Sequence, residues 1–114
     1  MATIHASEID SVKVIHLAGS LTSEGVENVN EIFEREIAGR KHLVINLAGV
    51  DLVATPGLCM LLSADRMLKR TGGKMVLAGS NQFVQDVLHR CKLDTVWAVV
   101  PNQEEALKVL GRSV

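Results

Sequence analysis

This sequence has few aromatic side chains and no excess of positive charge. Only 3% of its 114 residues are aromatic, tyrosine is absent, and twelve Lys and Arg residues face thirteen Asp and Glu residues, for a net charge of -1. Nucleic-acid binding needs clustered cations for the phosphates and aromatic platforms for the bases. We therefore expect no direct contact with nucleic acid.

Long apolar runs and closely spaced cysteines are also missing. No apolar stretch approaches the ~18 residues of a membrane-spanning helix, and the first ten residues lack the charged and apolar regions of a signal peptide. Cys59 and Cys91 lie far apart in the sequence. This spacing predicts two reduced, half-buried thiols. We expect a cytoplasmic protein without membrane insertion.

The motifs that usually carry catalysis are absent too. The sequence has no glycine-rich loop of the kind that binds nucleotide phosphates. It also has no G-x-S-x-G turn, which presents a nucleophilic serine in hydrolases. Its four histidines, at positions 5, 16, 42 and 89, show no metal-ligand spacing. We expect a protein that is not an enzyme and that needs no cofactor and no metal.

The composition is that of an ordinary folded domain. Hydrophobic residues make up 47% of the chain and charged residues 22%, which is typical of globular proteins. A chain of this length forms one core. The sequence therefore predicts a single domain over residues 1–114.

Apolar spacing predicts strands alternating with helices. Strands are expected at residues 12–17, with 3–5 as a pairing partner, and at 42–47, 75–78 and 96–100, where apolar runs are short. Helices are expected from a cap at Ser23 to Gly39, at 56–70 before Gly72 and Gly73, at 81–91 and at 104–110. This order predicts an α/β fold with a mixed, mostly parallel sheet and about four helices packed on it.

The helical spacing also predicts which side chains face the core. In the helix at 81–91, these are Phe83, Val84, Val87 and Leu88, and in the last helix they are Leu107 and Leu110.

The segment from Val50 to Leu62 reads as a strand end, a tight turn and a helix start. Thr55 precedes Pro56 and Gly57, which predicts that the threonine caps the helix and that the proline takes its first position. A phosphate on the threonine would also be favoured by the helix N-terminus. Thr55 is therefore either a cap alone or also a switch.

The helix after Thr55 has two distinct sides. One arc is predicted to be core, and it holds Met60, Leu61, Ala64, Met67 and Leu68. The other side carries Leu58 and Leu62 beside Asp65, Arg66 and Lys69. Apolar residues mixed with charges indicate either a partner-docking face or a surface covered by the preceding loop or by the first helix.

The order of these segments resembles the STAS domain of bacterial anti-sigma factor antagonists. The resemblance rests on LVINLAGVDLVATPGLCMLL followed by RMLKRTGGKMVLAG and then CKLDTVWAVVPNQEEAL. The positions that fit the family pattern are Val50, Val53, Gly57, Leu58, Leu61, Leu62, Gly72, Gly73, Val76 and Leu77. The resemblance covers nearly the whole chain and implies a STAS-like fold.

The resemblance also implies a partner-switching function. Such a protein binds an anti-sigma factor with serine/threonine kinase activity and so frees a sigma factor, and phosphorylation of a hydroxyl in the turn ends the binding. A phosphatase would restore the hydroxyl. The matching acceptor here is Thr55, although Ala54 stands where the family has an acidic residue and Pro56 where it has a small one. The predicted partner-binding residues are Ala54, Thr55, Pro56, Gly57, Leu58, Leu62, Asp65 and Arg66.

Two other functions remain open for a STAS domain. One is a regulatory subunit of a membrane-associated transporter of the lipid ABC type. The other is a scaffold component of a signalling assembly.

Overall fold

A computed structural model describes residues 2–39 and 41–111 of the chain. Within these residues, five strands form one sheet in the order β1-β2-β3-β4-β5. β1 runs antiparallel to β2, and every later pair is parallel. The strands are β1 Thr3–Ile9, β2 Val12–Leu21, β3 His42–Val53, β4 Lys74–Ala78 and β5 Ala98–Val100. The predicted fold class is confirmed.

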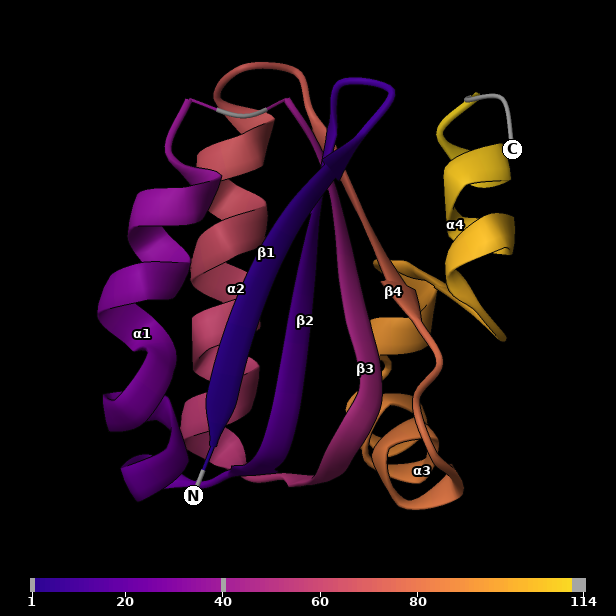
Figure 1. The fold of residues 1–114 in the computed structure, drawn as a ribbon. Helices are drawn as coiled ribbons and strands as arrows, with labels where there is room; N and C mark the ends of the chain where they lie inside the picture. The colour runs from indigo at the N-terminus through magenta and orange to yellow at the C-terminus, as the bar shows by residue number, and fades with distance from the viewer. Residues whose placement is uncertain (1, 40, 112–114) are drawn as a thin grey trace.

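Four α-helices connect or follow the strands, and their order matches the one predicted. They are α1 Ser23–Ile37, α2 Thr55–Lys69, α3 Gln82–Arg90 and α4 Gln103–Val109, with a short 3-10 helix, η1, at Leu93–Thr95. Figure 1 shows α1 and α2 side by side on one side of the sheet and α4 on the other. Among the described residues, no helix combines the length and the apolar character needed to cross a bilayer.

Two hydrophobic clusters hold these layers together. The larger lies between the sheet and α1, α2 and α3, with Phe33, Ile45 and Leu61 among its fully buried members. The smaller lies under α4, where Leu107 and Leu110 are buried as predicted. Because Leu43, Val44 and Ile45 are consecutive and all buried, β3 is covered on both faces, as a central strand of a parallel sheet should be.

The predicted element boundaries needed correction where tertiary pairing extends a strand or a cap lies one residue away. β3 continues past residue 47 to Val53 because residues 49–53 pair with the end of β2, through two register shifts. α1 is capped by Thr22 and not by Ser23, since the Thr22 hydroxyl accepts a hydrogen bond from the Gly25 N–H at 3.3 Å. β5 begins only at Ala98, because η1 occupies the preceding turn.

One predicted core residue is on the surface. Val84 and Leu88 of α3 are buried and Val87 is half-buried, but the Phe83 side chain is 76% exposed. In a helix, successive residues are rotated by about 100°, so Phe83 points away from the side that Val84 and Leu88 share.

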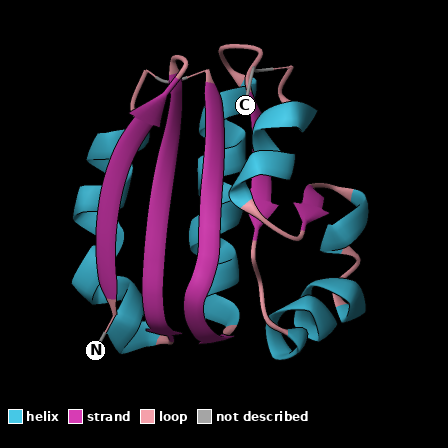
Figure 2. Cartoon of the chain, turned by 45° about the vertical axis from the view of Figure 1, so that its right-hand side comes forward, coloured by secondary structure: helices cyan, strands magenta, loops and turns pink. Residues whose placement is uncertain are grey.

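The parallel topology places several helix starts at one edge of the sheet. β2, β3 and β4 all end at this edge, which is the lower one in Figure 1, and α1, α2 and α3 begin there. Figure 2 shows the long β1, β2 and β3 strands in front of α1 and α2, with the shorter β4 and β5 beside them. The Thr55 turn lies at this edge.

Candidate functional site at the start of α2

The structure places Thr55 differently from the prediction. Ala54 is the N-cap residue, in an extended conformation and without a side-chain cap, and Thr55 is the first helical residue. The first helical hydrogen bond runs from the Leu58 N–H to the Ala54 carbonyl at 3.1 Å. The prediction that Thr55 caps the helix and that Pro56 is its first residue is therefore wrong by one position.

A bond to the neighbouring strand explains this shift. The Ala54 N–H donates to the Leu21 carbonyl at 3.0 Å, which holds Ala54 in the extended geometry of an N-cap. Pro56 then takes the second helical position, where its missing N–H also costs nothing, because the first N–H groups of a helix have no partner within it. The preference of threonine for N-caps yields here to a tertiary hydrogen bond.

The consequence for Thr55 is a free hydroxyl. Its side chain is exposed, and among the described residues it has no hydrogen-bond partner. Capping therefore does not account for the threonine at this position. An exposed hydroxyl on the first turn of a helix lies where the N–H groups and the macrodipole favour an anion such as phosphate.

Close packing beneath the turn fixes where Thr55 lies. Gly57 is buried, and a Cβ atom built on it would lie 2.8 Å from the Leu21 carbonyl oxygen and 2.8 Å from Val53 Cγ1. Heavy atoms in contact normally stay about 3.5 Å apart or more. Only glycine therefore lets the first turn of α2 approach β2 and β3 this closely.

Asn81 ties the start of α3 to the same edge. Its side-chain amide donates to the carbonyls of Val50 at 3.2 Å and Asp51 at 3.0 Å, and its Oδ1 accepts from the Val84 N–H at 2.9 Å. One side chain thus caps α3 and holds it against β3. β3, the strand that leads into the Thr55 turn, is therefore hydrogen-bonded to β2 on one side and to Asn81 on the other.

The other predicted partner-binding residues divide by exposure. Arg66 is exposed, and Ala54, Pro56, Leu58 and Leu62 are half-buried, with the two leucines packing their inner sides on the larger core cluster. Gly57 and Asp65 are buried.

Asp65 has little surface to offer a partner. Its Oδ2 lies 3.0 Å from Lys69 Nζ, and its side chain is only 11% exposed. Of the predicted core residues of α2, Met60, Leu61, Ala64 and Leu68 are buried and Met67 is half-buried.

A pocket beside Thr55 contains residues that sequence reasoning missed. Its volume is about 390 Å³, and Thr55, Leu58, Val87, Arg90 and Cys91 line it together with the end of β3. Arg90 and Cys91 come from the far end of α3, so only the tertiary fold, in which α3 packs against β3, brings them to Thr55. No local sequence signal marks them, because a basic residue in the last turn of a helix is ordinary.

The cysteines, the histidines and other potential metal ligands are the remaining candidate groups. Cys59 and Cys91 are free, but both are exposed, so the prediction of half-buried thiols is wrong. The β1–β2 register sets His5 opposite His16, with ring centroids 5.7 Å apart. No group of three or more potential metal ligands gathers within residues 2–39 and 41–111.

The fold matches solved structures of small regulatory domains. An anti-sigma factor antagonist from Mycobacterium paratuberculosis is 20% identical, with a TM-score of 0.87 over 96% of this chain and 93% of that one. SpoIIAA from Bacillus is an anti-sigma factor antagonist with solved structures of its unphosphorylated and phosphorylated forms. The unphosphorylated structure is 18% identical to this chain, with a TM-score of 0.80 over 98% of this chain and 100% of that one.

A protein of a transporter family has the same fold. A sulfate transporter family protein from Wolinella succinogenes is 13% identical, with a TM-score of 0.75 over 90% of this chain and 87% of that one. At these identities the likeness shows a shared fold. The STAS domain family model matches residues 3–106, and the chain therefore belongs to the STAS domain family.

Proposed function

We propose that this protein is an anti-sigma factor antagonist whose binding is switched by phosphorylation of Thr55. With a free hydroxyl it binds an anti-sigma factor that is also a serine/threonine kinase, and this frees a sigma factor. With a phosphate on Thr55 it releases that partner, and a phosphatase restores the binding form. The observation that carries the proposal is the exposed Thr55 hydroxyl, which makes no hydrogen bond within the described part of the chain.

The proposed modification is a phosphoryl transfer from ATP. The Thr55 Oγ1 attacks the γ-phosphorus and forms an O–P bond. The bond from that phosphorus to the oxygen bridging the β- and γ-phosphates breaks, ADP leaves, and the hydroxyl proton passes to a base on the kinase. The exposed position of Thr55 leaves its hydroxyl accessible to a kinase active site.

The phosphate would act on the interface and leave the fold intact. It adds about 1.5 to 2 negative charges at pH 7, and the first turn of α2 can accommodate them. At a partner surface the same charges must lose water, and a penalty of only ~1.4 kcal/mol lowers the affinity tenfold. The proposed surface consists of Ala54, Thr55, Pro56, Leu58, Leu62 and Arg66. Gly57 supports it from beneath, and Asp65 holds Lys69 beside it.

Labelling and pull-down experiments test this proposal. Incubation with ATP and the partner kinase should label the wild type and Thr55→Ser, but not Thr55→Ala. In pull-downs from the native host, Thr55→Ala should retain the kinase and Thr55→Glu should lose it. Thr95→Glu, which adds the same charge at an exposed threonine of η1, should behave as the wild type. Labelling at another residue, or binding by Thr55→Glu, would contradict the proposal.

The second candidate is a regulatory subunit of a membrane-associated transporter. Its support is the fold shared with the Wolinella sulfate transporter family protein. Genomic neighbours separate the two candidates, because the first predicts kinase and sigma-factor genes beside this one and the second predicts permease and ATPase genes.

A further inference from the structure

The pocket beside Thr55 pairs a hydroxyl with a guanidinium group. Thr55 lies at the start of α2 and Arg90 is the last residue of α3, and both line the same cavity of about 390 Å³. The other lining side chains are apolar, apart from the Cys91 thiol. Among the described residues, no carboxylate lines this cavity, so none of these side chains repels an anion or neutralises the guanidinium.

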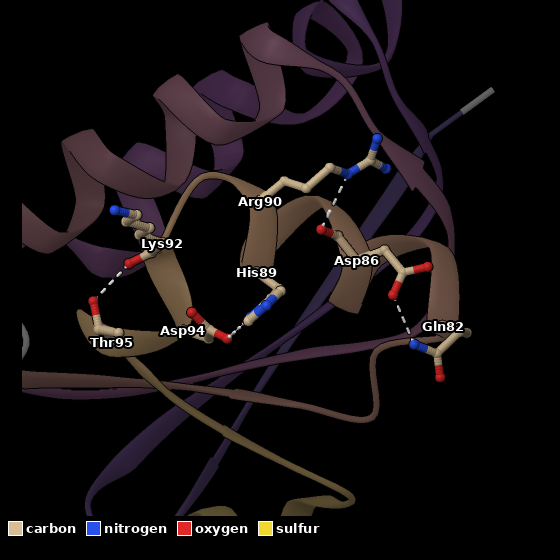
Figure 3. Close-up of polar contacts among 7 residues, drawn as sticks. All are labelled: Gln82, Asp86, His89, Arg90, Lys92, Asp94 and Thr95. Atoms are coloured by element: carbon tan, nitrogen blue, oxygen red, sulfur yellow. Dashed lines mark hydrogen bonds and ion pairs between the residues drawn. The ribbon is translucent and has the colours of Figure 1, made fainter.

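Arg90 keeps most of its hydrogen-bonding capacity unused. Its Nε donates only to the Asp86 backbone carbonyl, at a long 3.4 Å, and within the described part of the chain Arg90 makes no ion pair. The nearest carboxylates of α3 and η1 are engaged elsewhere, as Figure 3 shows. Asp86 Oδ1 accepts from Gln82 Nε2 at 2.8 Å, and Asp94 Oδ2 lies 2.9 Å from His89 Nδ1. In Figure 3 the Arg90 guanidinium extends away from the His89–Asp94 pair.

We propose that Arg90 binds the phosphate carried by Thr55, and this inference rests on the proposed function. A phosphothreonine offers three acceptor oxygens, and the planar guanidinium matches phosphate geometry with two parallel N–H donors. The apolar wall formed by Leu58 and Val87 strengthens the attraction by keeping water away from one side. In the phosphorylated form, the contact between the Arg90 guanidinium and the phosphate therefore links α3 to α2.

This bond gives the phosphorylated state two properties. The phosphate is held against α3, so a phosphatase removes it more slowly than it would remove a free phosphate on a mobile side chain. The cation also favours the doubly ionised phosphate, so the pKa of its second ionisation falls below the usual value of about 6.

A purely structural role for Arg90 predicts something different. A cation in the last turn of a helix stabilises that helix through the macrodipole, whatever Thr55 carries. Lys92, which lies two residues further on and is also exposed, does not line the cavity. It therefore serves as a matched control for loss of a nearby positive charge.

The experiment installs phosphothreonine at position 55 during translation, without using a kinase, and follows the phosphate by ³¹P NMR as a function of pH. The wild type should titrate with a midpoint near or below about pH 5.5, and Arg90→Gln near pH 6. Lys92→Gln should match the wild type, and Arg90→Lys should fall between the two. Alkaline phosphatase should remove the phosphate several-fold faster from Arg90→Gln.

Equal titration midpoints in the wild type and Arg90→Gln would overturn the proposal, as would an equal shift in Lys92→Gln. A thermal melt of each unphosphorylated variant shows that the folded protein is being compared. Because the phosphate is installed directly, these results do not depend on whether the partner kinase modifies Thr55, and failure of the labelling experiment above would be a separate finding.

Discussion

Substituting Gly57 by alanine tests how the first turn of α2 is held in place. The added Cβ would lie 2.8 Å from three heavy atoms, which are Leu21 Cβ, the Leu21 carbonyl oxygen and Val53 Cγ1. One of these belongs to the backbone of β2, so rotation of a side chain does not relieve the overlap. The turn must move away from β2, which weakens the hydrogen bond from the Ala54 N–H to the Leu21 carbonyl.

The expected cost follows from two opposing terms. Overpacking a well-filled site typically costs about 1–3 kcal/mol, while exchanging glycine for alanine within a helix gains up to ~1 kcal/mol. We expect a net loss of about 1–2 kcal/mol in the free energy of unfolding. With a urea slope of roughly 1.5 kcal/mol per molar, this lowers the midpoint by about 1 M.

Urea unfolding followed by tryptophan fluorescence measures this loss. The chain has one tryptophan, and Trp97 is only 3% exposed, so its emission reports loss of the core. Ser63→Ala, at an exposed position of the same helix, is the matched control and should be as stable as the wild type or slightly more stable. A Gly57→Ala protein that is equally stable or more stable would refute the packing argument. Thr55 labelling of this variant should also slow, because its hydroxyl moves with the turn.

Three further substitutions test other parts of the structure. Asn81→Ala removes three hydrogen bonds and should lower the free energy of unfolding, measured with urea, by about 2 kcal/mol. Asn102→Ala removes only the cap of α4 and should lower it by about 1 kcal/mol. Equal losses would show that the two bonds from Asn81 to β3 contribute nothing to stability. Phe83→Ser should change stability by less than about 0.5 kcal/mol, because the side chain is 76% exposed and such sites are tolerant; a loss above ~2 kcal/mol would return Phe83 to the core. Leu62→Glu should weaken partner binding at least tenfold while circular dichroism shows a folded protein; an unfolded variant would mean that Leu62 serves only the core.

The elements and their order could be predicted because apolar spacing reports burial directly. The buried stripe of α2 and the inward position of Leu107 and Leu110 followed from helical periodicity, and the mostly parallel sheet followed from alternation of strands with helices. Periodicity failed at Phe83. There, the hydrophobic character of the side chain predicts a core position, but the residue lies about 100° away from the buried side of the helix.

The details of the site depended on contacts that are distant in sequence. Local preference favours threonine over alanine as an N-cap, yet the hydrogen bond from Ala54 to Leu21 decides the start of α2. Arg90 reaches the Thr55 pocket only because α3 packs against β3, the strand that leads into α2. No pattern within a single element contains either fact. The family resemblance points to the Thr55 hydroxyl, but only the fold shows that this hydroxyl does not cap α2.

The most direct test of the switch is the affinity of the partner kinase for the two forms of the protein. Isothermal titration calorimetry, with a non-hydrolysable ATP analogue present, compares unmodified protein with protein carrying phosphothreonine at position 55. The proposed function predicts tight binding of the unmodified form and at least tenfold weaker binding of the phosphorylated form. Equal affinity of the two forms would contradict the switch.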